Sequence, residues 1–295
     1  MKVAIIGPGA LGCLFAARLT RGGAQATLVD YRADRAARLN ESGVTVNVGG
    51  ETYTQHVPVV LGVPPKQDLI LVLTKSYSTK ELRLTPNVPV LTLQNGLGNV
   101  DILCGLVGSA CVLGGVTSEA ATLLGEGHVR HVSEGSTVFG TWTSCDPQPA
   151  FAVFEKAGFR VELTDAPGQT IWEKVAVNAG INPITALLGI PNGMILQIPE
   201  ARQLMRDLVV EAVKVATTEG YKFDHSVVEE AEEICGTTAE NISSMLQDVR
   251  AGKRTEIDAI SGSILARAEA AALHTPRTRV VWQLVRGLEQ RAKQG

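Results

Sequence analysis

One lysine and two asparagines lie at helical spacing in the second half of the chain. Lys174, Asn178 and Asn182 occur at i, i+4 and i+8 among small apolar residues, so on a helix one amine and two amides share a face. A solvated helix face normally carries mixed charges, and this face therefore predicts a site that grips a small polar molecule. The alternative is an exposed lysine followed by two asparagines at a frayed helix end.

A proline next to the third polar residue complicates this helix. Pro183 disfavours the α conformation at Asn182, so we expect the helix to end or kink there. Asn182 would then be the N-cap of a second helix that starts at Pro183, a position that suits both residue types. Asn182 is thus predicted either to bind the ligand or to cap a helix.

A glycine-rich turn near the start of the chain predicts a dinucleotide-binding site. Residues 2–6 form a β-branched run, and a helical pattern follows from Ala10 to about Arg21. The turn between them has the spacing G-x-G-x-x-G in the strand-to-helix context of the dinucleotide fingerprint, with a helix N-terminus that attracts phosphate. The predicted cofactor-binding residues of this turn are Gly7, Pro8, Gly9, Ala10, Leu11 and Gly12.

An acidic residue ends the second predicted strand. Residues 26–30 form this strand, and Asp30 has the spacing of a carboxylate that bonds the adenosine ribose hydroxyls, as in NAD-binding proteins. Asp30 would also repel the additional phosphate of NADP. Arg32 and Arg35 follow and could offer that phosphate two cations, so these residues leave NADP(H) and NAD(H) both open.

Two further strands deliver polar residues to one edge of the predicted sheet. Residues 68–75 form a continuous apolar run that ends in Lys75, and residues 88–94 form another that precedes Asn95 and Gly96. Ligands bind at the carboxyl ends of such strands, so Lys75 and Asn95 are predicted to contact the cofactor. A plain turn is the alternative for Asn95 and Gly96.

The residue patterns divide the chain into two domains and place it in the α/β class. We expect an N-terminal Rossmann-type doubly wound sheet over residues 1–166 and an all-helical C-terminal domain over residues 167–295, which holds the substrate. The sheet is expected to have about seven or eight strands. Its later members are a hairpin at 44–54 inserted in the wound sheet and strands at 111–116, 127–132, 137–140 and 159–163. Helical stripes lie at 204–216 and 249–273 and in a last helix opened by Thr275 and Pro276.

Composition and cysteine usage limit the class of protein. A net charge of −3 with 45% apolar residues suits a soluble globular protein and does not recruit nucleic acid or an anionic membrane. No segment approaches the ~18 apolar residues of a membrane span. Five scattered cysteines without a C-x-x-C spacing indicate unpaired thiols in a reducing compartment, so a cytoplasmic location is expected. His128 and His131 would point to opposite faces of a strand, so we expect no metal site.

Taken together, the motifs resemble those of the ketopantoate reductase (2-dehydropantoate 2-reductase) family over nearly the full chain. The matching segments are residues 7–12, 73–75, 94–96, 172–186, 240–248 and 255–258. The resemblance implies an oxidoreductase that uses NADPH to reduce 2-dehydropantoate to (R)-pantoate, a step toward pantothenate and coenzyme A. A small keto acid is then the partner molecule. The apolar helical half could bury a homodimer face or form intramolecular core.

The resemblance also implies roles for individual residues. Lys174 corresponds to the general acid, Glu256 to the carboxylate that binds the substrate hydroxyl, and Asn95 to a residue that touches nicotinamide and substrate. The other implied substrate-binding residues are Asn178, Asn182 and Ser244. Hydride arriving at a ketone leaves negative charge on oxygen, which a lysine attracts and protonates. Burial would lower the pKa of Lys174 and Glu256 would raise it, and the sequence does not decide between them.

The second strand departs from the family pattern, and other functions stay open. Family members that use NADPH commonly have an arginine where this chain has Asp30, although Lys75 matches, so NADPH is favoured with NADH as the alternative. For Glu256 the alternative is an ordinary charged helix surface. Alternative functions are a paralogous reductase of another 2-keto acid and a non-catalytic dinucleotide-sensing protein.

Overall fold

The computed structural model describes residues 1–108 and 111–291, which separate into two compact units. The first unit comprises Met1–Gln94 and Asn99–Thr170, and the second comprises Asn95–Gly98 and the chain from Ile171 onward. The short segment Asn95–Gly98 thus belongs with the second unit, although it follows a strand of the first.

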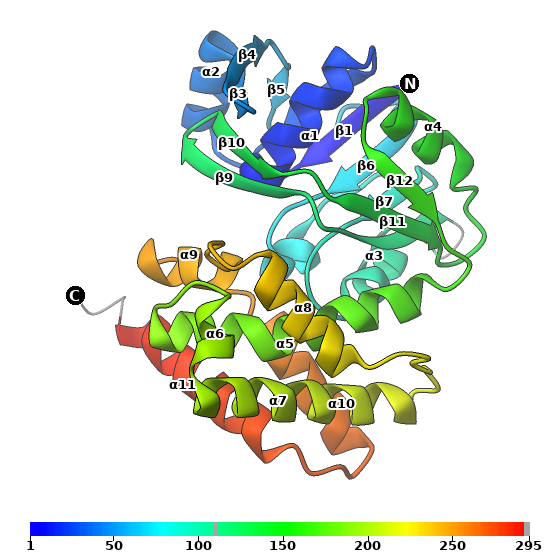
Figure 1. Ribbon diagram of the computed structural model, residues 1–295. Coiled ribbons are helices and arrows are strands. Elements are labelled where there is room, and N and C mark those ends of the chain that lie inside the picture. Colours follow the sequence, from blue (N-terminus) through cyan, green and yellow to red (C-terminus); the bar gives the residue numbers. More distant parts are fainter. Residues whose placement is uncertain (109–110, 292–295) are drawn as a thin grey trace. The chain divides into compact units, whose positions relative to one another are not determined.

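An eight-stranded sheet forms the centre of the first unit (Figure 1). Its order is β12-β11-β8-β7-β6-β1-β2-β5, and every neighbouring pair is parallel except β8 with β11. The successive residues Ala4 and Ile5 of β1 are fully buried, as are Ile70 and Leu71 opposite them on β6, so both faces of the sheet are covered. The predicted wound α/β sheet is confirmed. The strands are β1 (Lys2–Ile6), β2 (Gln25–Val29), β5 (Val59–Val60), β6 (Leu69–Val72), β7 (Val90–Thr92), β8 (Val112–Thr117), β11 (Ser136–Thr141) and β12 (Arg160–Leu163).

Helix α1 (Ala10–Arg21) is buried around most of its circumference. Phe15 at its centre stacks on Phe159 with ring centroids 4.4 Å apart and meets Phe154 edge-on at 5.7 Å. A helix that is apolar all round requires cover on several sides, and two sheets provide it here. The other helices of the first unit are α2 (Ala33–Ser42), the 3-10 helix η1 (Ser76–Glu81), α3 (Asn99–Val107) and α4 (Gln148–Lys156).

A second, four-stranded sheet with the order β4-β3-β10-β9 provides that additional cover. Its strands are β3 (Val44–Val48), β4 (Glu51–Gln55), β9 (Ala120–Gly125) and β10 (His128–Ser133). The expectations that the 44–54 hairpin is inserted in the wound sheet and that 127–132 extends that sheet are wrong. Val44, Val46 and Val129 are fully buried in one cluster with α1, so these strands form a separate layer over the helix.

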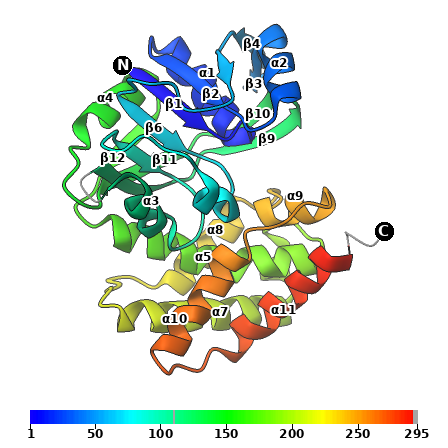
Figure 2. The same ribbon diagram turned by 180° about the vertical axis from the view of Figure 1, so that it is seen from behind.

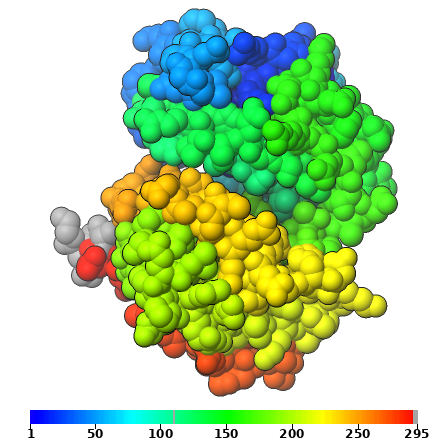
Figure 3. Space-filling model, viewed as in Figure 1, coloured from blue at the N-terminus to red at the C-terminus, as the bar shows by residue number. Residues whose placement is uncertain are grey.

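Within the described residues, the second unit contains helices and no strand, as predicted (Figure 2). Its helices are α5 (Pro167–Leu188), α6 (Met194–Gln197), α7 (Pro199–Thr218), α8 (Val227–Thr237), α9 (Ser244–Arg250), the π-helical turn η3 (Asp258–Gly262), α10 (Ser263–Ala270) and α11 (Pro276–Arg291). The first four residues of α5 belong to the first unit. Helices α8 and α9 form the yellow and orange surface of the second unit in the space-filling view (Figure 3). The stripe predicted over 249–273 is not one helix, because α9 ends at Arg250 and helical structure resumes at Asp258.

Helix α5 continues through Pro183, so it does not end at Asn182, and the alternative that Asn182 caps a second helix is wrong. The Thr185 hydroxyl donates to the carbonyls of Ile181 and Asn182 at 3.1 and 3.0 Å. Ile181 and Ile184 are buried, and tertiary packing of this kind supplies most of the stability of a helix in a protein. The proline is therefore tolerated inside the helix.

The state of the cysteines and the lengths of the helices agree with the expectations from the sequence. All five cysteines are free thiols, as predicted, and Cys13, Cys145 and Cys235 are buried. Among the described residues, no helix combines the length and the apolar character that crossing a membrane requires.

Candidate active site

The glycine-rich turn lies between β1 and α1, where the chain reverses its direction of winding through the main sheet. Gly7 has a φ of 105°, and a Cβ there would lie 2.7 Å from the backbone nitrogen of Thr74, so the turn requires glycine. A Cβ on Gly9, the N-cap of α1, would meet no atom within 4 Å. The tight turn at Gly7, the open space beside Gly9 and the N-terminus of α1 together fit a dinucleotide pyrophosphate.

Asp30 follows β2, and its carboxylate forms an ion pair with an arginine. Its carboxylate is 1% exposed and accepts hydrogen bonds from Nε and Nη2 of Arg35 at 2.5 and 2.6 Å and from the backbone N–H of Arg32 at 3.0 Å. Arg32 extends to Asp34 on the exposed surface. The Asp30 hydrogen bond raises the pKa of Arg35, so that guanidinium stays charged and neutralises the acid. The Arg35 guanidinium is therefore engaged by Asp30 and is not available to bind a phosphate.

Lys75 follows β6 in the loop that meets the glycine turn through Thr74. The Gln94 amide donates to the Thr74 carbonyl at 2.8 Å and to the Thr79 hydroxyl at 2.9 Å. Thr79 in turn donates to Asn99 at 3.0 Å. Gln94, Thr79 and Asn99 are buried, so this network fixes the loop that carries Lys75. Sequence reasoning assigned no role to Thr79 or Asn99, because their partners come from separate strand ends.

Asn95 and Glu256 meet within the second unit. The Asn95 amide donates to Oε2 of Glu256 at 3.2 Å, and Glu256 is only 6% exposed. The backbone N–H of Leu97 donates to the Ala259 carbonyl at 2.9 Å. Gly96 has a φ of 88°, and a Cβ there would lie 2.5 Å from that carbonyl oxygen. Glu256 is thus part of a buried polar site, and the alternative of an ordinary charged helix surface is wrong.

Lys174 lies on α5 and is electrostatically coupled to Glu256. Burial lowers the pKa of Lys174 from its ordinary value of 10.5 to about 8, and the Glu256 carboxylate opposes part of that change. Burial is therefore the stronger of the two effects that the sequence left undecided. A lysine with a pKa near neutrality can both bind negative charge and release a proton.

The two asparagines share the helix face of Lys174, because α5 is continuous. Asn178 is half-buried and Asn182 is 6% exposed. Ser244, the first residue of α9, is exposed. The preceding residue, Ser243, is buried, caps α9 by accepting from the Leu246 N–H at 3.1 Å, and lies 2.7 Å from the Thr185 hydroxyl of α5. Ser243 thus ties the start of α9 to α5, one turn beyond Asn182.

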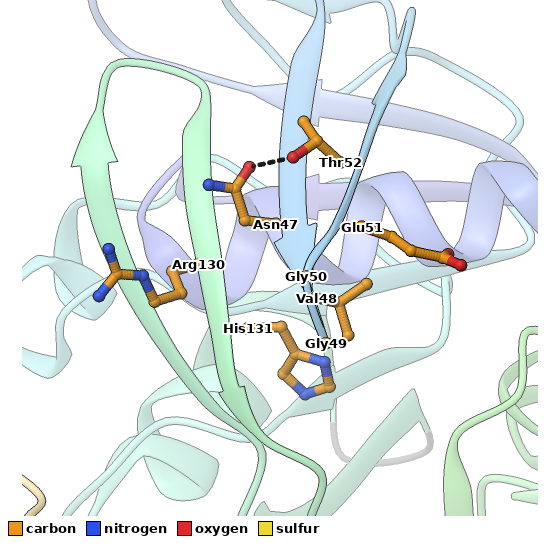
Figure 4. Close-up of a pocket in the computed structure, with 8 residues that line it drawn as sticks. All are labelled: Asn47, Val48, Gly49, Gly50, Glu51, Thr52, Arg130 and His131. Carbon is orange, nitrogen blue, oxygen red and sulfur yellow. Dashed lines mark hydrogen bonds between the residues drawn. The ribbon is translucent and has the colours of Figure 1, made fainter.

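An open pocket of about 300 Å³ lies elsewhere, in the second sheet of the first unit (Figure 4). It is lined by Asn47, Val48, Gly49, Gly50, Glu51, Thr52, Arg130 and His131 and contains none of the predicted site residues. On one wall, the Thr52 hydroxyl donates to Oδ1 of Asn47 at 3.2 Å (Figure 4). The pocket has no lysine and is not the candidate active site.

The two histidines with metal-like spacing bind different partners. His128 lies 3.1 Å from Oδ1 of Asn47, whereas His131 lies 2.6 Å from Oε2 of the buried Glu119, which also pairs with Arg18 at 3.1 Å. Among the residues that the structure describes, no three His, Cys, Asp or Glu side chains group as metal ligands. Arg18 belongs to α1, so this cluster joins that helix to the second sheet.

Comparison with known proteins covers both units. A family described as "Ketopantoate reductase PanE/ApbA" matches residues 3–144, and its C-terminal counterpart matches residues 168–289. The chain is 35% identical to the 2-dehydropantoate 2-reductase of Halobacterium salinarum, over 97% of this chain and 98% of that protein. A D-mandelate dehydrogenase solved with NADH and anilino(oxo)acetate is similar with a TM-score of 0.94 and 26% identity, over 99% and 100% of the two chains. A ketopantoate reductase from Ralstonia eutropha is similar with a TM-score of 0.90 and 30% identity, over the same shares.

Proposed function

The chain belongs to the ketopantoate reductase family, and from that premise we propose that it reduces 2-dehydropantoate to (R)-pantoate by hydride transfer from NADPH. The reaction is a step toward pantothenate and coenzyme A. The observation that carries the proposal is the electrostatic interaction of the half-buried Lys174 with Glu256, with Asn95 hydrogen-bonded to the same carboxylate. The predicted cofactor-binding residues belong to the first unit apart from Asn95, which belongs to the second unit with the predicted keto-acid-binding residues.

Lys174 is the proton donor in this mechanism. When bound, the reduced nicotinamide supplies a hydride to the ketone carbon, and negative charge develops on the ketone oxygen. The Lys174 ammonium attracts that charge and transfers a proton to it, leaving a neutral amine. A pKa of about 8 keeps Lys174 protonated at neutral pH and makes the transfer easier than from an ordinary lysine.

Glu256 and the amides orient the substrate. Glu256 accepts a hydrogen bond from the terminal hydroxyl of 2-dehydropantoate, and the Asn95 amide holds that carboxylate in place. Asn178, Asn182 and Ser244 donate hydrogen bonds to the substrate carboxylate and carbonyl. These are neutral donors, so they orient the keto acid without altering the charge balance around Lys174.

The charges beside Asp30 support NADPH as the cofactor and also admit NADH. Arg35 neutralises Asp30, which offsets the repulsion that a bare carboxylate would exert on the 2′-phosphate. Arg32 is held by Asp34 in an exposed ion pair, and such pairs are weak. Arg32 can therefore exchange Asp34 for the 2′-phosphate, while Lys75 contacts the cofactor from the neighbouring loop.

A reductase of another 2-keto acid is the second candidate. The similarity to a D-mandelate dehydrogenase solved with NADH favours it, because that enzyme shares the architecture over 99% of this chain. The two candidates differ in the role of Glu256, since only a substrate with a terminal hydroxyl engages it. The non-catalytic sensor is disfavoured because Lys174 can donate a proton. We also place the protein in the cytoplasm, because five free thiols suit a reducing compartment. A homodimer stays a prediction.

The deciding experiment is oxidation of NADPH by 2-dehydropantoate, run beside NADH and beside the same keto acid without its terminal hydroxyl. We expect the highest kcat/KM with NADPH and 2-dehydropantoate. Equal kcat/KM values for the two keto acids would contradict the substrate assignment. An affinity for NADPH no better than that for NADH would contradict the cofactor assignment.

A further inference from the structure

The last helix holds the backbone segment that carries Glu256, and we propose that Glu289 on this helix is a positioning residue for substrate recognition. The proposal rests on the proposed role of Glu256 as the group that binds the substrate hydroxyl. Glu289 itself acts through Thr255, the residue that precedes Glu256 in the chain.

One carboxylate oxygen fixes both sides of Glu256. Oε1 of Glu289 accepts the Thr255 N–H at 2.7 Å and the Thr255 hydroxyl at 2.6 Å. The same hydroxyl oxygen accepts the Ile257 N–H at 3.2 Å. Thr255 is 1% exposed and Glu289 is 8% exposed, so water cannot readily replace these bonds. The backbone before and after Glu256 is therefore set by the position of Glu289.

Two more side chains of α11 grip the next turn. Trp282 donates through its indole N–H to Oδ1 of Asp258 at 3.0 Å, and Arg286 donates to Oδ2 at 2.9 Å. Trp282, Arg286 and Glu289 are spaced i, i+4 and i+7, so they lie on one face of α11, which contacts the η3 turn.

The turn that these α11 side chains contact is irregular, so its conformation depends on contacts from outside the turn. Asp258–Gly262 is π-helical, and both Ala259 and Ile260 donate their N–H groups to the Glu256 carbonyl at 3.0 Å. Such turns are rare and concentrate at functional sites. Ala259 also accepts the Leu97 N–H, so a shift of this turn would move Asn95 and Glu256 together.

Removing the Glu289 carboxylate should therefore affect recognition of the keto acid more than the chemical step. Glu289→Ala leaves two buried donors of Thr255 without their acceptor, and Glu256 then loses its fixed position. We expect KM for 2-dehydropantoate to rise about tenfold, with a smaller change in kcat. Glu289→Gln keeps an oxygen acceptor and should restore most of the affinity.

Glu211 provides a matched control within the same unit. It is also a buried carboxylate, and its Oε2 accepts the N–H and the hydroxyl of Thr278 at 2.8 and 2.7 Å. This pair secures the first turn of α11, whereas Glu256 is gripped near the other end of the helix. Glu211→Ala removes the same number of threonine hydrogen bonds, so it should lower the melting temperature without changing the discrimination between keto acids.

The test is the ratio of kcat/KM for 2-dehydropantoate to kcat/KM for the same keto acid without its terminal hydroxyl, in wild type, Glu289→Ala, Glu289→Gln and Glu211→Ala. A ratio that falls in Glu289→Ala and recovers in Glu289→Gln supports the positioning role. An unchanged ratio in Glu289→Ala, or an equal fall in Glu211→Ala, overturns it. If Glu289→Ala does not fold, Thr255→Val decides in the same way. Wild type that turns over neither keto acid would instead contradict the proposed function.

Discussion

Two acid–base pairs in this chain are built in opposite ways. Asp30 and Arg35 are close in sequence and share two hydrogen bonds of 2.5 and 2.6 Å, so their charges cancel locally. Lys174 and Glu256 come from distant segments, and burial lowers the pKa of Lys174 to about 8 while Glu256 opposes that shift. The local Asp30–Arg35 pair has a fixed geometry and little net charge, which suits binding. Long-range coupling under burial makes a group that can give up a proton.

The largest expected effect is the loss of the proposed proton donor. Lys174→Met should lower kcat by about 10²- to 10⁴-fold, the usual contribution of a general acid, and should leave the affinity for the cofactor unchanged. Lys214→Met, which alters an exposed lysine of α7, is the matched control and should keep full activity. Steady-state kinetics with a separate cofactor titration measures both. A Lys174→Met enzyme with undiminished kcat would remove the contrast between the two pairs.

The pH dependence of kcat/KM should reveal the titration of Lys174. Lys174 must be protonated to act as an acid and its pKa is about 8, so kcat/KM for reduction should be level below pH 8 and fall about tenfold per pH unit above it. Oxidation of pantoate needs the neutral amine and should rise over the same range. Lys174→Arg keeps its charge throughout and should show no such break. A wild-type profile that stays level to pH 10 would exclude Lys174 as the donor.

Neutralising the acid partner should sharpen the contrast. Glu256→Gln removes the charge that raises the pKa of Lys174, so the break in the pH profile should move below pH 8. KM for 2-dehydropantoate should rise by about tenfold, because a charge-assisted hydrogen bond to the substrate is lost. The parallel change Asp30→Asn should leave the position of the break where it is in wild type. Breaks that move equally in both variants would mean that the effect is not specific to Lys174.

The residues predicted to bind the cofactor could be picked out because their signals are local. The glycine turn and Asp30 lie within one strand–helix–strand unit, and periodicity identified each element around them. Even here, the sequence left open whether Arg35 offers a cation to a phosphate, and the structure pairs it with Asp30. A sequence does not specify which neighbour a long, charged side chain chooses.

The residues proposed to bind the keto acid depend on contacts that the sequence does not encode locally. The continuous α5 was missed because Pro183 is a helix breaker by propensity, and packing of Ile181 and Ile184 overrides it. The second sheet was missed because β3 pairs with β10, from a distant part of the chain. The contact between Thr255 and Glu289 has no sequence signal at all, since a buried glutamate near the end of a helix resembles any polar surface residue.

The smallest expected effect concerns the exposed charges beside Asp30. Arg32 and Arg38 both pair with Asp34 on the surface, and Arg38 also pairs with Glu126. Only Arg32 lies next to the strand end where the adenosine is expected, so the two arginines form a matched pair for substitution. Arg32→Ala should raise KM for NADPH by roughly five- to tenfold and leave KM for NADH unchanged, because only NADPH carries the 2′-phosphate.

Arg38→Ala should leave both cofactor constants unchanged, because it removes an equal charge from the same surface. The informative quantity is therefore the ratio of the two KM values, measured at low and at high salt, since an exposed phosphate contact weakens as salt screens it. A ratio that is unchanged in Arg32→Ala would mean that Arg32 does not bind the phosphate. The neutralised Asp30–Arg35 pair would then accept NADPH and NADH equally. It would contribute to cofactor binding but not to the preference between the two cofactors.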